Sequence, residues 1–163
     1  GVAAINAGGM TIHSLFQLPF GIYLPNSRQD LSRQRKITKE KINVFQTLDL
    51  LIIDEISMVR ADMLDAIDDV LRRYRRSTLP FGGVQLLMIG DLHQLPPVVK
   101  REDWQLLKDV YQTPYFFGSH ALQQTQPITI KLTHIYRQSD RDFIDLLNKV
   151  RNDQLDQEVL EAL

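Results

Sequence analysis

The feature that most limits the fold of this chain is the run Leu50–Ile53, four consecutive apolar residues followed directly by Asp54 and Glu55. Four apolar residues in a row predict a strand buried on both faces, as in a parallel sheet with helices on either side. The two carboxylates then lie at the carboxyl end of the strand, where open α/β sheets bind their ligands. This stretch therefore favours an α/β fold with a site at one sheet edge.

The residue types at this edge indicate a particular chemistry. A carboxylate there can hold Mg²⁺, directly or through water, and its neighbour can take a proton from an attacking water. The sequence Asp54-Glu55-Ile56-Ser57 has the pattern of a Walker B strand of a nucleotide hydrolase. A buried strand that merely ends in an acidic turn is the alternative that this stretch alone leaves open.

Strand and helix patterns alternate along the rest of the chain, which predicts a mainly parallel sheet flanked by helices. Strands are expected at 2–5, 84–89, 115–117 and 128–132, and helices at 12–16, 60–76, 119–122, 140–150 and 157–163, while the segment 102–110 is amphipathic. In the helix at 60–76, aspartates precede arginines, and this order complements the helix dipole. The basic stretch 18–43 is either a solvated, partly helical connection or a phosphate-contacting surface.

Composition excludes several classes of protein. The net charge is −1, so any nucleic-acid surface must be local, and the absence of cysteine rules out disulfides, zinc–thiolate sites and thiol nucleophiles. No apolar run approaches the ~20 residues of a membrane span, so no membrane partner is expected. The histidines have no metal-ligand spacing, and no Gly-x-Ser-x-Gly elbow occurs. An intracellular location is expected.

A second polar group follows the expected strand at 84–89. Gly90-Asp91-Leu92-His93-Gln94 comes at its end, on the same sheet edge as Asp54 and Glu55, and Pro96-Pro97 holds the exit rigid. Gln94 can both donate and accept hydrogen bonds, which suits sensing a γ-phosphate or orienting a water. A strand that ends at prolines through a polar turn is the alternative.

A third candidate is Arg137, at the junction between the strand expected at 128–132 and the helix that Asp140 opens. An arginine in such a position can reach transition-state phosphate charge as an arginine finger acting in cis. By itself, an arginine here is equally compatible with a surface ion pair.

Four blocks, taken in order, resemble the motifs of one family, the petite-integration-frequency DNA helicases, which are superfamily-1 relatives of the RecD helicase subunit. The blocks are GVAAINAGGMTIHSLF at 1–16, LIIDEISMV at 51–59, PFGGVQLLMIGDLHQLPPV at 80–98 and LTHIYRQSDRDFIDLLNKVR at 132–151. The resemblance extends from Gly1 to about Leu163 and is weakest in 18–43 and 101–113.

The resemblance implies that 1–163 is part of the first RecA-like motor domain, with a P-loop NTPase fold, of an ATP-driven helicase. Such a helicase moves 5′ to 3′ on single-stranded DNA and unwinds duplex junctions. By this analogy Asp54 binds Mg²⁺, Glu55 activates the hydrolytic water and Gln94 couples the γ-phosphate of ATP to DNA. Arg137 is then the phosphate-sensing finger.

The same resemblance implies two surfaces for DNA. Thr11, His13 and Ser14 match the motif that touches the DNA backbone, and 99–115 falls where the family carries a strand-separating wedge. Trp104, Tyr111 and Tyr115 are either base-stacking or packing residues there. The implied location is the cytoplasm, with nucleoid association, for a bacterial protein, and the nucleus or mitochondrion for a eukaryotic one.

One departure from the family pattern is clear: no G-x-x-x-x-G-K-[ST] loop occurs in the sequence. In the family this loop lies upstream of the opening block, so we expect a fragment truncated at both ends. The missing partners are the Walker A segment and the second motor domain, and the isolated chain is expected to be inactive or nearly so.

Two further hypotheses stay open. The chain is alternatively a degenerate motor domain that acts as a DNA- or protein-binding module, which the presence or absence of an upstream Walker A loop would decide. The other hypothesis is a Mg²⁺-dependent nuclease that uses Asp54, Glu55 and Asp91. A nuclease explains neither Gln94 nor Arg137.

Overall fold

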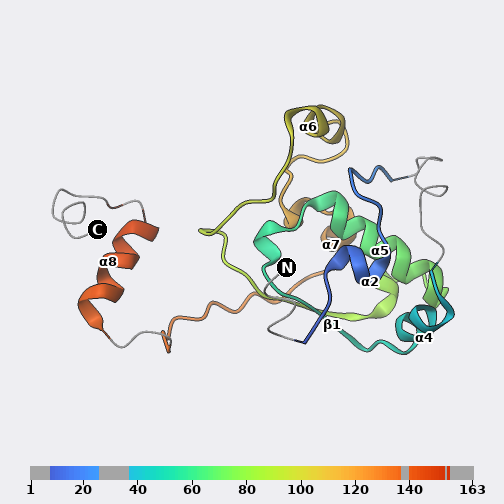
Figure 1. Ribbon diagram of the computed structural model, residues 1–163, viewed down its shortest axis with the longest axis horizontal. Coiled ribbons are helices and arrows are strands. Elements are labelled where there is room, and N and C mark those ends of the chain that lie inside the picture. The colour runs from blue at the N-terminus through green and yellow to red at the C-terminus, as the bar shows by residue number, and fades with distance from the viewer. Residues whose placement is uncertain (1–7, 26–36, 137–139, 153, 155–163) are drawn as a thin grey trace. The chain divides into compact units, whose positions relative to one another are not determined.

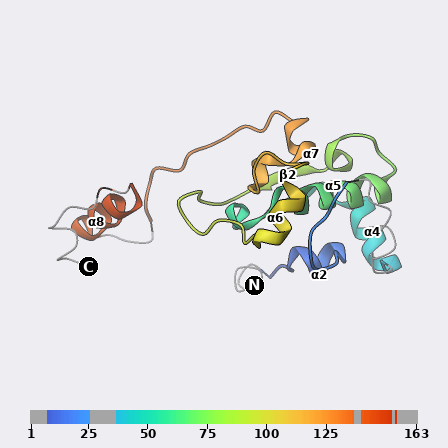
Figure 2. The same ribbon diagram turned by 90° about the horizontal axis from the view of Figure 1, so that it is seen from above.

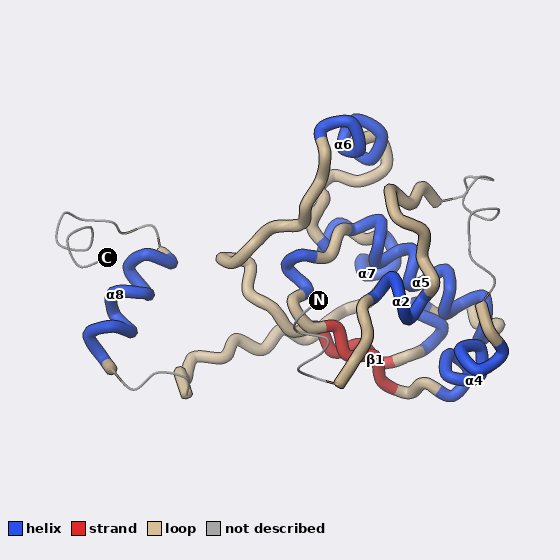
Figure 3. The backbone as a smooth tube through the Cα atoms, viewed as in Figure 1, coloured by secondary structure: helices blue, strands red, loops and turns tan. Residues whose placement is uncertain are grey.

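The computed structural model describes residues 8–25, 37–136, 140–152 and 154, with only the backbone of Arg141 (Figure 1). The chain divides into two compact units, Gly1–Pro127 and Ile128–Leu163, which are considered separately below. Short strands and many helices and loops make up the first unit (Figure 3).

The first unit is organised around helix α5, Ala61–Arg75. Its apolar residues recur at helical spacing, and Leu64, Ile67, Val70 and Leu71 are fully buried. Arg76 ends the helix in the left-handed region, with its backbone N–H donating to the carbonyls of Arg72 and Arg73. Helix α4, Lys39–Thr47, and helix α7, His120–Gln123, both contact α5. The helix expected at 60–76 is confirmed.

Among the described residues the sheet has two parallel strands, β1, Leu50–Ile53, and β2, Gln85–Met88, in a register that pairs Ile53 with Met88. Leu51 and Ile53 are buried in the same cluster as the apolar face of α5. Ile52 and its cross-strand neighbour Leu87 are 55% and 45% exposed. The expectation that β1 is buried on both faces is therefore wrong for the described residues, which cover only one face of the sheet.

Two short helices, α2 and α4, precede the strands of the sheet in the sequence. Helix α2, Ile12–Phe16, begins where predicted, at Thr11, whose Oγ1 accepts the backbone N–H of Ser14 at 3.2 Å. Helix α4 begins in the described part of the stretch 18–43 and continues beyond it. Phe16 and Phe45 stack with ring centroids 5.3 Å apart and so join the two helices. Seen from above, α2 and α7 lie on opposite sides of α5 (Figure 2).

Two predicted strands are wrong. Residues 116–118 form the 3₁₀ turn η3, Phe116–Gly118, and Tyr115 makes only an isolated bridge to Arg60. Residues 128–132 are extended and exposed without strand pairing. An alternating pattern produces a strand only where a partner supplies backbone hydrogen bonds, and no described segment supplies them here. The strand expected at 2–5 and the helix expected at 157–163 lie outside the described residues.

The second unit contains helix α8, Arg141–Arg151, as predicted. Asp140 is its N-cap, with Oδ1 accepting the backbone N–H of Phe143 at 3.1 Å. The brief helix predicted at 119–122 is likewise confirmed in the first unit as α7, where Ser119 Oγ accepts the N–H of Leu122 at 3.1 Å.

Helix α6, Arg101–Leu107, lies at the end of two long loops (Figure 1). Its return segment is tied to α5 by Asp65, a carboxylate that is only 7% exposed. Asp65 accepts four hydrogen bonds: from the Tyr111 hydroxyl at 2.9 Å, the Ser119 hydroxyl, and the backbone N–H groups of His120 at 3.1 Å and Ala121 at 3.0 Å. One buried side chain thus holds the α6 arm and α7 on the central helix.

This network predicts that Asp65→Ala lowers the free energy of unfolding by about 3 kcal/mol or more, because several buried donors lose their acceptor. Tyr111→Phe removes one hydrogen bond to a charged group and should cost about 1.5 kcal/mol. Urea unfolding of the chain measures both. Asp109→Ala, at an exposed aspartate, is the matched control and should stay within about 0.5 kcal/mol. An Asp65→Ala variant as stable as this control would contradict the assignment.

Candidate functional site

The carboxyl ends of β1 and β2 meet at one edge, as the sequence predicted. The N–H of Ile89 donates to the carbonyl of Ile53 at 2.9 Å, and the N–H of Ile56 donates to the carbonyl of Ile89 at 2.9 Å. The loop that begins with Asp54 and Glu55 is therefore joined by backbone hydrogen bonds to the end of β2, where Gly90 and Asp91 follow.

Gly90 is required by this close approach. A Cβ atom at Gly90 would lie 2.9 Å from Cγ2 of Ile56 and 3.0 Å from the Ile56 backbone nitrogen. The first distance is shorter than real Cβ contacts and the second is tighter than most of them, so a larger residue at this position would require Ile56 to shift. Sequence analysis recognised the position of Gly90 at a strand end but had no signal for this contact.

The two acidic residues of the β1 loop differ in environment. Asp54 is exposed, and its Oδ1 accepts the backbone N–H of Glu55 at 2.9 Å. Glu55 is half-buried and adopts left-handed backbone angles, φ 53° and ψ 44°. Buried Ser57, two residues on, has no hydrogen-bond partner for its hydroxyl among the described residues. Costly local features of this kind concentrate at functional sites.

The β2 loop forms a tight turn that presents Gln94. The N–H of Gln94 donates to the carbonyl of Asp91 at 3.1 Å, and Oδ1 of Asp91 accepts the N–H of His93 at 3.0 Å. Asp91 therefore shapes the turn. The side chain of Gln94 is exposed at the same sheet edge as Asp54. An exposed amide and an exposed carboxylate on adjacent loops can together contact a polar, anionic ligand and its metal ion.

Within residues 8–25, 37–136, 140–152 and 154, no group of three or more histidine and acidic side chains is placed to hold a metal ion. The three-carboxylate arrangement that a nuclease using Asp54, Glu55 and Asp91 requires is therefore not present among these residues. Arg137, the candidate finger, lies outside the described residues.

The candidate DNA-contacting residues surround the start of α2. The Thr11 hydroxyl caps the helix, Ser14 is exposed, and the carbonyl of Ser14 accepts hydrogen bonds from Lys41 Nζ and, at 2.9 Å, from Gln17 Nε2. His13 is half-buried. Burial of His13 and, to a smaller extent, the positive charge of Arg60 lower the pKa of its imidazole below the usual value. Its ring is therefore mostly neutral at pH 7.

The three aromatic candidates in 99–115 have packing roles. Tyr111 is buried against Asp65 and stacks on His120 at a centroid distance of 4.9 Å; burial and the carboxylate raise the pKa of its hydroxyl. Trp104 packs in the cluster formed by Ala61, Leu107 and Tyr111. Tyr115 stacks on Phe117 at 5.3 Å. Base stacking by Tyr111 is excluded in this conformation, because its ring is covered.

Sequence analysis missed the anchoring role of the aspartates of α5. Asp62, 1% exposed, accepts the backbone N–H of Tyr23 at 2.9 Å and pairs with Arg60 at 2.7 Å. Arg60 Nη2 also donates to the carbonyl of Gly21 at 2.6 Å. The acid-before-base order suggested only a dipole effect, because such a pattern does not distinguish a buried aspartate from a solvated one.

None of the helices that the structure describes combines the length and the apolar composition that a membrane span requires.

Comparison with known proteins adds a family match. The family model described as PIF1-like helicase matches residues 1–161. The ATP-dependent DNA helicase RRM3 of Saccharomyces cerevisiae is 35% identical over 164 residues, and the ATP-dependent DNA helicase PIF1 of Homo sapiens is 37% identical over 164 residues. Both alignments cover 100% of this chain but only 21% and 24% of those proteins. The chain thus spans less than a quarter of either relative.

Solved structures of Pif1 helicases are also similar to this chain. The crystal structure of Pif1 helicase from Bacteroides in complex with ADP-AlF3 and ssDNA matches with a TM-score of 0.93 and 46% identity, over 99% of this chain and 37% of that one. The Pif1 helicase of Candida albicans matches with a TM-score of 0.78 and 36% identity, over 99% of this chain and 34% of that one.

The contact at Gly90 predicts that Gly90→Ala destabilises the chain by about 1–3 kcal/mol, because the added methyl group crowds the side chain and the backbone nitrogen of Ile56. Thermal unfolding measures this. Leu92→Ala, at an exposed side chain in the same loop, is the control and should leave the melting temperature nearly unchanged. Equal melting temperatures for the two variants would show that the loops separate without cost.

Proposed function

The chain belongs to the PIF1-like helicase family and has the RecA-like α/β fold of its structural neighbours. From this premise we propose that it forms part of the first motor domain of an ATP-dependent DNA helicase that moves 5′ to 3′ on single-stranded DNA. The observation that carries the proposal is the parallel pairing of β1 with β2, which brings Asp54 and Glu55 to the same edge as the Asp91–Gln94 turn.

The donor groups at this edge suit a magnesium nucleotide. Mg²⁺ prefers oxygen ligands and is usually held by one or two carboxylates, waters and substrate phosphates. Asp54 is exposed and supplies such an oxygen. When bound, Mg²⁺ would offset negative charge on the phosphates. In this proposal Asp54 holds the ion, and ATP is the nucleotide.

Glu55 and Gln94 have separate tasks. Glu55 accepts the proton of the attacking water from a half-buried position directly after the end of β1. Gln94, presented by the Asp91 turn, hydrogen-bonds to the γ-phosphate and so couples the bound nucleotide to the DNA surface. Arg137 is proposed as the finger that binds transition-state phosphate charge.

Single-stranded DNA and duplex junctions are the proposed partners. A crystal structure of the related Bacteroides Pif1 is bound to ssDNA, and another similar structure concerns DNA unwinding at forked dsDNA by two coordinating Pif1 helicases. In this chain Thr11, His13 and Ser14 are the proposed backbone contacts, with Lys41 adding positive charge beside Ser14. The segment 99–115, carried by the α6 arm, is the proposed wedge. A Walker A loop and a second motor domain of the same protein would complete the ATP site.

The test is ATP hydrolysis with and without single-stranded DNA, on this chain and on a version that includes a Walker A loop and a second motor domain. We expect DNA-stimulated turnover only in the longer version. In that version Glu55→Gln should reduce turnover by about two to four orders of magnitude, because the general base is lost, while ATP binding remains. Asp49→Asn, at an exposed aspartate directly before the amino end of β1, is the matched control.

Two results would contradict the proposal. Steady ATP hydrolysis by this chain alone, abolished by Glu55→Gln, would show that the Walker A segment is dispensable. DNA binding without turnover in either version would instead indicate the binding module.

A further inference from the structure

Phe20 is an exposed aromatic side chain next to the candidate DNA-contacting residues. Its side chain is 87% exposed, and its ring stacks on that of His13, with centroids 5.0 Å apart and an interplanar angle of 22°. His13 lies in α2, between Thr11 and Ser14. The two rings therefore form a short aromatic platform with one outer face in solvent.

The backbone around Phe20 is held on both sides. Leu18 is buried in the main core, the carbonyl of Gly21 accepts a hydrogen bond from Arg60 at 2.6 Å, and the N–H of Tyr23 donates to Asp62 at 2.9 Å. Pro19 further restricts the local backbone. The ring is thus presented on a supported segment, and binding of a ligand to it requires little ordering of the chain.

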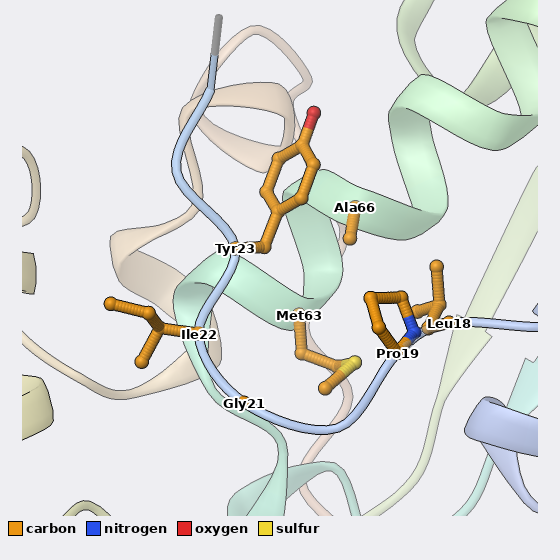
Figure 4. A pocket seen from close by; sticks show the side chains of 7 residues that line it. All are labelled: Leu18, Pro19, Gly21, Ile22, Tyr23, Met63 and Ala66. Atoms are coloured by element: carbon orange, nitrogen blue, oxygen red, sulfur yellow. The ribbon is translucent and has the colours of Figure 1, made fainter. Parts of the chain in front are cut away.

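The space beneath this segment cannot accept the Phe20 ring. A cavity of about 20 Å³ lies between residues 18–23 and helix α5, and Met63 and Ala66 form its far wall (Figure 4). This volume holds about one water molecule. Phe20 does not line the cavity, so its exposed ring is not simply displaced from a nearby pocket.

The surroundings suit a nucleobase attached to a phosphate backbone. The ammonium group of Lys41 lies at the Ser14 carbonyl, and no carboxylate among the described residues pairs with it. The imidazole of His13 is mostly neutral at pH 7, because burial and the charge of Arg60 lower its pKa. A cation therefore lies at the residue next to His13, and a positive charge near an aromatic face is the combination used by proteins that bind single-stranded nucleic acid.

We propose that the Phe20 ring, backed by His13, stacks on one base of the single-stranded DNA whose backbone contacts Thr11 and Ser14. The inference rests on the proposed function and adds to it a contact with a base, which is independent of base identity because every base has an aromatic face. It gives the α2 region a means to hold the strand by a base as well as by phosphates.

The test compares the affinity of this chain for two fluorescein-labelled strands of equal length, oligo(dT) and an abasic strand, by fluorescence anisotropy at low salt. We expect the chain to bind oligo(dT) about tenfold more tightly, because only this strand offers a base to stack. Phe20→Ala should bring the oligo(dT) affinity close to that of the abasic strand, whose affinity stays unchanged. Leu79→Ala, at another exposed apolar side chain, should change neither affinity.

A second variant gives a direct signal. Phe20→Trp combined with Trp104→Phe leaves one indole, at position 20, since Trp104 is the single tryptophan of the sequence. Its fluorescence should be quenched by oligo(dT) and not by the abasic strand. Lys41→Ala should weaken the binding of both strands to the same extent, because this change removes only a positive charge. The melting temperature of Phe20→Ala should equal that of the unmodified chain, since the ring is exposed.

The outcomes separate the two proposals. Equal affinity for both strands in the unmodified chain, or an equal loss for both in Phe20→Ala, overturns base stacking and leaves backbone binding intact. Failure to bind either strand overturns base stacking together with the proposed DNA surface at α2.

Discussion

The first unit depends on two buried carboxylates one helical turn apart on α5. Asp62 pairs with Arg60 and accepts a hydrogen bond from the backbone N–H of Tyr23. Asp65 accepts hydrogen bonds from the Tyr111 hydroxyl and from the loop that opens α7. A buried carboxylate is costly unless several donors satisfy it, so each of these aspartates forces distant segments to a defined place on the helix. The N-terminal half of α5 thereby anchors connections that have little apolar surface of their own.

The apolar face of the same helix positions the sheet. Leu64, Ile67 and Leu71 pack in one cluster with Leu51 and Ile53 of β1, so the sheet edge is positioned by hydrophobic contact. Gly90 then allows the β2 loop to approach the β1 loop closely enough for the backbone hydrogen bond between Ile56 and Ile89. The proposed ATP site is therefore built on strand ends joined by backbone hydrogen bonds, with Asp54 and Gln94 exposed to ligand and Glu55 half-buried.

The DNA surface is supported from the same helix. Asp62 and Arg60 hold the segment that carries Phe20, and α2 packs on α4 through the stacked rings of Phe16 and Phe45. The proposed ATP site and the proposed DNA surface thus share α5 as their support.

The sequence by itself determined the local elements and the order of the polar motifs. The apolar periodicity of α5, the caps Thr11, Ser119 and Asp140, and the polar residues after β1 and β2 all follow from interactions within a few residues. Only the tertiary structure decided which aspartates are buried, which face of β1 is covered, that 128–132 has no strand partner among the described segments, and that Phe20 stacks on His13. Burial and strand pairing depend on partners distant in the chain, such as Tyr111 for Asp65, and a local pattern carries no record of them.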